Sequence, residues 1–129
     1  MKMNWISASL LLGISFFCHP VFAQVINLTP QAFKQQMETK PGYLLDVRTD
    51  WEYAEGHLKQ AQNSDVNSPV FEKLANILDS EKPCYVYCHS GGRSSEASAL
   101  LVSKGMKKVY NLEGGISAWK KQGYPVVKK

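Results

Sequence analysis

Residues 84–94 read CYVYCHSGGRS, and this stretch decides the architecture of the chain. Its first four residues are apolar or aromatic, as in a strand that is covered on both faces of a parallel sheet. Gly91 and Gly92 then allow the backbone to turn, and Ser95 to Lys104 has small and apolar residues at helical spacing. The pattern predicts a strand, a loop and a helix, with Cys88 where the strand enters the loop.

This position favours a nucleophilic role for Cys88. Unpaired N–H groups and the macrodipole at a helix N-terminus attract negative charge, so a thiol placed there ionises more easily. Gly91 and Gly92 would let the loop curl with its N–H groups inward, as in an anion-binding nest. A buried, inert cysteine is the alternative for Cys88 taken alone, but strand, loop and helix start together indicate a nucleophile. The bound anion would be a phosphate or a sulfur species carried on Cys88.

The flanking segments continue the alternation of strands and helices. Strand-like runs cover residues 25–26, 43–47 and 109–112, and helical patterns cover residues 29–37, 49–55, 70–78 and the segment around Ile116 and Trp119. This order predicts an α/β fold with a mostly parallel sheet and right-handed crossovers. Because sites in such sheets gather at the carboxyl ends of the strands, we expect Asp46 and Cys88 to lie close together.

Residues 1–23 have the pattern of a Sec signal peptide. Lys2 supplies a positive start, Trp5 to Phe17 is largely apolar, and cleavage after Ala23 follows small residues. The apolar stretch is shorter than the ~20 residues that span a bilayer, which argues against the alternative of a membrane anchor. We therefore expect a periplasmic protein with no stable membrane anchor and with one domain at residues 24–129.

The net charge of +4 comes from scattered lysines. No basic helix interleaved with aromatic residues is present, so we expect no nucleic-acid partner. The charge fits small anionic substrates instead.

Cys84 and Cys88 would be the two cysteines of the mature chain. On one strand they would lie about 13 Å apart, at about 3.3 Å per residue, whereas a disulfide needs Cα atoms within ~7 Å. We expect Cys84 to be a small buried apolar residue and Cys88 to be a free thiol.

Arg93 lies five residues after Cys88, which gives a Cys-x4-Arg loop. Cysteine-dependent phosphatases carry Cys-x5-Arg, one residue longer. With the shorter loop, the chain resembles the rhodanese-like sulfurtransferases. Residues 45–48 (LDVR), 52–53 (EY) and 56–58 (GHL) resemble the N-terminal signature of that family, and residues 111–116 (NLEGGI), 119 (W) and 123–126 (GYPV) its C-terminal one. Secreted single-domain rhodaneses of Gram-negative bacteria are the nearest likeness.

The resemblance implies a rhodanese-like fold, with a five-stranded parallel sheet flanked by helices on both faces. It also implies a thiosulfate sulfurtransferase in which the Cys88 thiolate takes the outer sulfur of thiosulfate or a similar donor. The Cys88 persulfide would then pass this sulfur to cyanide or a thiol, without a metal or an organic cofactor, in a protein that we expect to be a monomer. The implied substrate-binding loop comprises His89, Ser90, Gly91, Gly92, Arg93 and Ser94.

The chain holds two arginines, and both lie within these motifs. For Arg93 we expect contact with the anionic donor, with bracing of the loop as the alternative. For Arg48 we expect a pair with Asp46 or Glu52 that supports the floor of the site, so that Asp46 is a structural acceptor. We expect His57 to have a packing role, because persulfide chemistry needs no general base.

Two positions depart from the family pattern. His89 stands where thiosulfate-using members often carry arginine, which leaves the choice of donor open, and Gln60 stands where glycine is common.

Two other functions remain as alternatives. A persulfide carrier or protein-binding module with little small-molecule turnover would have the same Cys88. A phosphatase or arsenate reductase would need one more residue between Cys88 and Arg93.

Overall fold

The computed structural model describes residues 2, 13–18 and 23–129. Most of the predicted signal peptide, residues 1–23, lies outside the described residues, so the signal peptide and the domain boundary at residue 24 stay predictions. Within the described part of the chain, every helix is too short or too polar to cross a membrane.

Five strands form one sheet in which every neighbouring pair is parallel. The strands are β1 (Val25–Leu28), β2 (Tyr43–Asp46), β3 (Gln62–Asn63), β4 (Cys84–Tyr87) and β5 (Val109–Leu112), in the spatial order β1-β5-β4-β2-β3. This arrangement confirms the predicted five-stranded parallel sheet. The segment-by-segment patterns did not show β3, because two residues are too few to produce a recognisable period.

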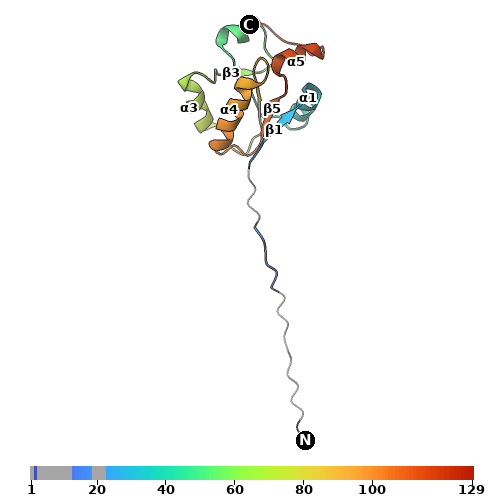
Figure 1. Cartoon of the computed structure of the whole chain (residues 1–129), viewed down its shortest axis with the longest axis vertical. Helices are drawn as coiled ribbons and strands as arrows, with labels where there is room; N and C mark the ends of the chain where they lie inside the picture. Colours follow the sequence, from blue (N-terminus) through green and yellow to red (C-terminus); the bar gives the residue numbers. More distant parts are fainter. Residues whose placement is uncertain (1, 3–12, 19–22) are drawn as a thin grey trace.

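Helices cover both faces of the sheet (Figure 1). They are α1 (Pro30–Thr39), α2 (Asp50–Glu55), α3 (Pro69–Ile77), α4 (Gly92–Ser103) and α5 (Gly115–Lys121). Figure 1 shows α3 and α4 together on one side and α1 and α5 on the other. The α4 helix starts at Gly92, earlier than the Ser95 start that the spacing of small residues predicts, so Arg93 and Ser94 lie in its first turn.

The central strand β4 divides its side chains between two cores. Cys84, Val86 and Cys88 pack with residues such as Phe71 and Leu101 of the α3 and α4 side. Tyr85 and Tyr87 pack on the other side, in a core whose other members include Phe33, Ile116 and Trp119. Successive side chains of a strand point to opposite faces, so a strand buried on both faces must be apolar throughout. This packing fixes the direction in which Cys88 leaves the sheet.

Gln60 adopts a left-handed backbone conformation, with a φ of 69°. Glycine reaches this region without the steric conflict that a Cβ atom creates. At the position where the family commonly has glycine, this chain therefore keeps the left-handed turn but places a strained glutamine in it.

We predict that Gln60→Gly raises the free energy of unfolding by about 1 kcal/mol, because the substitution removes this conflict. Denaturant unfolding followed by circular dichroism measures the change. Gln122 is the matched control, since it is also exposed but has a φ of −77°. Gln122→Gly is expected to leave stability unchanged or to lower it, and an equal gain at both positions would contradict the explanation.

Candidate active site

Cys88 follows the last residue of β4, beside the carboxyl end of β2. Tyr87 pairs with Asp46 in the sheet, so the structure brings Cys88 and Asp46 to the same edge. The Cys88 residue is only 1% exposed. Its thiol thus lies at the bottom of the loop formed by residues 88–94.

The loop directs hydrogen-bond donors at the sulfur of Cys88. The Gly91 N–H lies 3.1 Å from Sγ, and the Ser94 hydroxyl oxygen lies 3.3 Å from Sγ. Burial raises the pKa of Cys88, but the hydrogen bonds from the Ser94 side chain and from backbone N–H groups of Ser94, Gly91 and Ser90 outweigh it, so the pKa is lowered. Gly91 has a φ of 121°, which a residue with a side chain rarely adopts.

Cys84 provides an internal comparison, because it lies on the same strand and points into the same core. Burial alone raises the pKa of Cys84 to about 12. Both cysteines are free thiols. The loop, and not the strand, therefore distinguishes the reactive environment from the inert one.

The start of α5 holds the loop from outside. The N–H groups of Ile116 and Ser117 donate to the carbonyl oxygens of Cys88 and His89, at 2.9 and 3.1 Å. A Cβ atom on Gly115 would lie 2.4 Å from the His89 oxygen, so only glycine permits this approach. With these carbonyl groups turned outward, the loop N–H groups face the sulfur.

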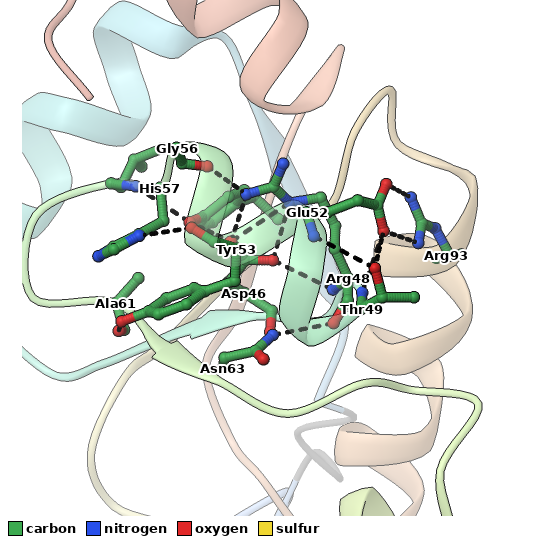
Figure 2. Close-up of polar contacts among 12 residues, drawn as sticks. Asp46, Arg48, Thr49, Glu52, Tyr53, Gly56, His57, Ala61, Asn63 and Arg93 are labelled. Atoms are coloured by element: carbon green, nitrogen blue, oxygen red, sulfur yellow. Dashed lines mark hydrogen bonds and ion pairs between the residues drawn. The ribbon is translucent and has the colours of Figure 1, made fainter. Parts of the chain in front are cut away.

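Arg93 points toward α2 and forms a two-pronged ion pair with Glu52 (Figure 2). Its Nη1 and Nη2 atoms lie 2.8 and 2.9 Å from the two carboxylate oxygens. Glu52 also accepts from the hydroxyl and N–H of Thr49, the N-cap residue of α2, in a capping box. The hydrogen bond from Arg93 is the main reason that the pKa of Glu52 falls to about 2. Arg93 thus links the active loop to α2, and contact between Arg93 and a donor stays a prediction.

Arg48 pairs with Asp46, not with Glu52. Its Nε and Nη2 atoms contact the carboxylate at 3.0 and 2.7 Å, and Nη2 also donates to the Gly56 carbonyl oxygen at 2.6 Å. The Tyr87 hydroxyl donates at 2.6 Å to Asp46 Oδ2, the same oxygen that Arg48 Nη2 contacts. The Asp46 residue is fully buried. This buried group reaches the active loop through Tyr87, the residue before Cys88, and its support of the loop stays a prediction.

The sequence reasoning missed two members of this buried group. Tyr87 is the last residue of β4 and directly precedes Cys88. Asn63 on β3 donates to the carbonyl oxygens of Asp46 and Arg48 at 3.1 and 2.8 Å. A tyrosine in an otherwise apolar buried strand is a signal for Tyr87, because its hydroxyl needs a partner. Asn63 gave no such signal.

His57 stacks on Tyr53 with 3.6 Å between the ring centroids, and its Nδ1 atom lies 2.8 Å from the Tyr53 carbonyl oxygen. Figure 2 shows His57 at the opposite end of this group from Arg93. Its backbone also pairs with Val127 near the C-terminus. These contacts give His57 a packing role.

Two pockets flank the loop. One, of about 510 Å³, is lined by Ser90, Gly91 and Gly92 of the loop together with residues of β1, α4 and β5. The other, of about 250 Å³, lies between α2, α5 and His89. Among the described residues, no three His, Cys, Asp or Glu side chains gather in the way that a metal ion requires.

A family model described as "Rhodanese-like domain" matches residues 29–122. A sulfurtransferase of Allochromatium vinosum is 33% identical over 104 residues, which cover 80% of this chain and 95% of the relative. The thiosulfate sulfurtransferase GlpE of Pseudomonas fluorescens is 36% identical over 92 residues, which cover 70% of this chain and 82% of the relative. Both relatives are of similar size to this chain.

Other relatives are longer proteins. The tRNA uridine(34) hydroxylase of Onion yellows phytoplasma is 36% identical over 98 residues, which cover 73% of this chain. The match spans only 32% of that hydroxylase. Among solved structures, a rhodanese-related protein of Thermoplasma volcanium superposes with a TM-score of 0.70 at 27% identity, covering 81% of this chain and 99% of the other.

We predict that Ser94→Ala raises the pKa of Cys88, because the variant removes a side-chain hydrogen bond to the sulfur. The pH dependence of alkylation at Cys88 measures the pKa, in a Cys84→Ala background. Ser95→Ala is the matched control, since the Ser95 hydroxyl donates to the Gly91 carbonyl oxygen and not to the sulfur. Equal shifts in both variants would contradict a direct role of the Ser94 hydroxyl.

We predict that Glu52→Gln destabilises the fold by about 1 kcal/mol at pH 7. The pKa of Glu52 falls from 4.5 to about 2 on folding, so the unfolded chain binds the proton first. The difference between wild type and variant is therefore complete above pH 4.5 and disappears as the pH falls toward 2. Denaturant unfolding at several pH values measures this difference. Glu38→Gln removes only an exposed ion pair with Lys34, and a matching profile there would contradict the prediction.

Proposed function

The chain belongs to the rhodanese-like domain family, and on this basis we propose that it transfers a sulfane sulfur from thiosulfate or a similar donor to cyanide or a thiol. The relatives named sulfurtransferases support a transferase. The observation that carries the proposal is the Cys88 sulfur, which lies within hydrogen-bond distance of the Gly91 N–H and the Ser94 hydroxyl and has a lowered pKa. Such a site stabilises a thiolate and an anionic persulfide alike.

In the first step, the Cys88 thiolate attacks the outer sulfur of thiosulfate. A bond forms between Sγ and this sulfur, the sulfur–sulfur bond of thiosulfate breaks, and sulfite leaves with the bonding electron pair. The enzyme then holds an anionic Cys88 persulfide. The total charge is conserved, because the thiolate and thiosulfate together carry three negative charges, as do the persulfide and sulfite. The N–H groups of the loop stabilise the charge on the sulfur throughout.

The Ser94 hydroxyl can form a hydrogen bond with the sulfur whether Cys88 is a neutral thiol or a thiolate. It lies 3.3 Å from Sγ and 3.2 Å from the Gly91 carbonyl oxygen. With a neutral thiol, Ser94 accepts from the thiol and donates to Gly91; with a thiolate, it donates to the sulfur. This exchange requires only rotation of one hydroxyl proton.

In the second step, an acceptor attacks the outer sulfur of the persulfide. Cyanide leaves as thiocyanate, or a thiolate leaves as a new persulfide, and Cys88 returns as a thiolate. Arg93 keeps the loop in place through Glu52, and in this proposal its guanidinium also contacts the anionic donor. The reaction uses no metal or organic cofactor.

The predicted signal peptide of residues 1–23 supports a periplasmic location, where the protein acts as a monomer without a membrane anchor. Its partners there are a small anionic sulfur donor and a thiol acceptor, and not nucleic acid.

A persulfide carrier that turns over small donors poorly is the second candidate. The observation that favours it is the match to tRNA uridine(34) hydroxylases, in which the matching residues form about a third of a longer protein. A saturable thiosulfate:cyanide activity of the isolated chain separates the two candidates.

We predict that the mature protein, residues 24–129, gains the mass of one sulfur atom on incubation with thiosulfate and loses it again on addition of cyanide. Intact-mass spectrometry measures both changes. Cys88→Ser removes the proposed nucleophile, so this variant should show neither change. Cys84→Ser is the matched control and should retain both.

An adduct that survives in Cys88→Ser, or no adduct in the wild type, would contradict the proposal. An adduct that forms normally without saturable thiocyanate production would support the carrier instead.

A further inference from the structure

The pocket of about 250 Å³ beside His89 has an unusual set of charges. We call it the α2–α5 pocket. Its lining includes Trp51, Glu52 and Glu55 from α2, Lys120 from α5, and Arg48 and His89 from the adjoining loops. His89 directly follows Cys88 in the chain, so the pocket borders the active loop.

Two of the charges in this lining are already neutralised by protein partners. Glu52 forms its ion pair with Arg93, and Arg48 forms its ion pair with Asp46. Each pair carries no net charge, and Glu52 and Arg48 are held in place by further hydrogen bonds. Neither pair therefore needs a ligand to balance it.

Lys120 and Glu55 are the remaining charges. Both residues are exposed, and neither forms an ion pair within the described part of the chain. They line the same pocket from different helices without pairing with each other. The pocket thus presents one free positive and one free negative group.

We propose that the α2–α5 pocket binds the thiol acceptor, and that this acceptor is a small zwitterionic thiol with both a carboxylate and an ammonium group. Lys120 binds the carboxylate and Glu55 binds the ammonium group. This inference rests on the proposed function, and it assigns the acceptor class that the family resemblance leaves open.

The donor fits this pocket less well. Thiosulfate carries only negative charge, so the free carboxylate of Glu55 repels it. The indole of Trp51, which is 63% exposed, adds an apolar wall that suits the carbon atoms of an amino-acid-sized thiol. The volume of the pocket excludes a folded protein domain but admits such a molecule.

Binding in the pocket places the acceptor for the second step. Its thiolate attacks the outer sulfur of the Cys88 persulfide, a new sulfur–sulfur bond forms, and the bond to Sγ breaks. The electron pair of the broken bond stays on Sγ, which regenerates the Cys88 thiolate. The acceptor leaves as a persulfide, with no external oxidant or reductant.

The test uses mature protein preloaded with the Cys88 persulfide and four thiols: cysteine, cysteamine, 3-mercaptopropionate and 2-mercaptoethanol. Single-turnover rates of persulfide loss are compared between each variant and wild type, so that differences in thiol reactivity cancel. Lys120→Gln should slow cysteine and 3-mercaptopropionate by about fivefold, and Glu55→Gln should slow cysteine and cysteamine by about fivefold. Neither variant should affect 2-mercaptoethanol.

Lys121→Gln is the matched control, because Lys121 is a neighbouring exposed lysine that does not line the pocket. It should leave all four rates unchanged. Effects that are equal for all four thiols, or absent for all, would overturn the inference. Slower persulfide formation from thiosulfate in Lys120→Gln would also overturn it, since the pocket would then serve the donor.

A binding measurement separates failure of this inference from failure of the proposed function. S-methylcysteine has both charged groups but no thiol, so it tests the pocket without sulfur transfer. Its titration should shift the indole N–H resonance of Trp51, assigned with Trp51→Phe, and Lys120→Gln and Glu55→Gln should each weaken binding about fivefold. The absence of a shift would overturn the inference even if thiosulfate loads Cys88. Absence of the persulfide together with a normal shift would overturn only the proposed function.

Discussion

The orientation of two peptide groups governs the whole site. The carbonyl groups of Cys88 and His89 point away from the sulfur because N–H groups at the start of α5 bind them. Gly115 permits this contact, since any Cβ there would collide with the same carbonyl groups. The peptide between His89 and Ser90 then carries the Ser90 N–H toward Sγ. With the Gly91 and Ser94 N–H groups and the Ser94 hydroxyl, it lowers the pKa of Cys88 despite burial.

Ion pairs fix the loop from the remaining sides. Arg93 ties it to α2 through Glu52, and the pair of Arg48 with Asp46 holds Tyr87, the residue before Cys88. Both arginines of the chain are therefore committed to protein partners. Lys120 and Glu55 have no ion-pair partner among the described residues, which is why these two residues carry the argument about the acceptor.

Much of the fold was visible in the sequence because burial on both faces leaves a simple pattern. The apolar run of β4 and the helical spacing after it predict a strand, loop and helix, and the structure has them. The two-residue strand β3 and the start of α4 at Gly92 were not visible. The strand β3 exists through its pairing with β2, which no local period records. The start of α4 has no side-chain cap that would mark it in the sequence.

For the site, the sequence by itself determined which thiol stands at the start of the loop and how long the loop is. The order Cys88, glycines and helix start is a local property that places N–H groups near the sulfur. The contact with α5 that turns two loop carbonyl groups outward is tertiary. Only the tertiary structure decided how the charges pair. From the sequence, Glu52 and Asp46 were equal candidates as the partner of Arg48. In the structure Asp46 pairs with Arg48, and Glu52 pairs with Arg93. Lys120 and Glu55, from different helices, line one pocket. Charge pairing depends on distances of a few ångströms between segments far apart in the chain, and these distances exist only once the helices have packed on the sheet.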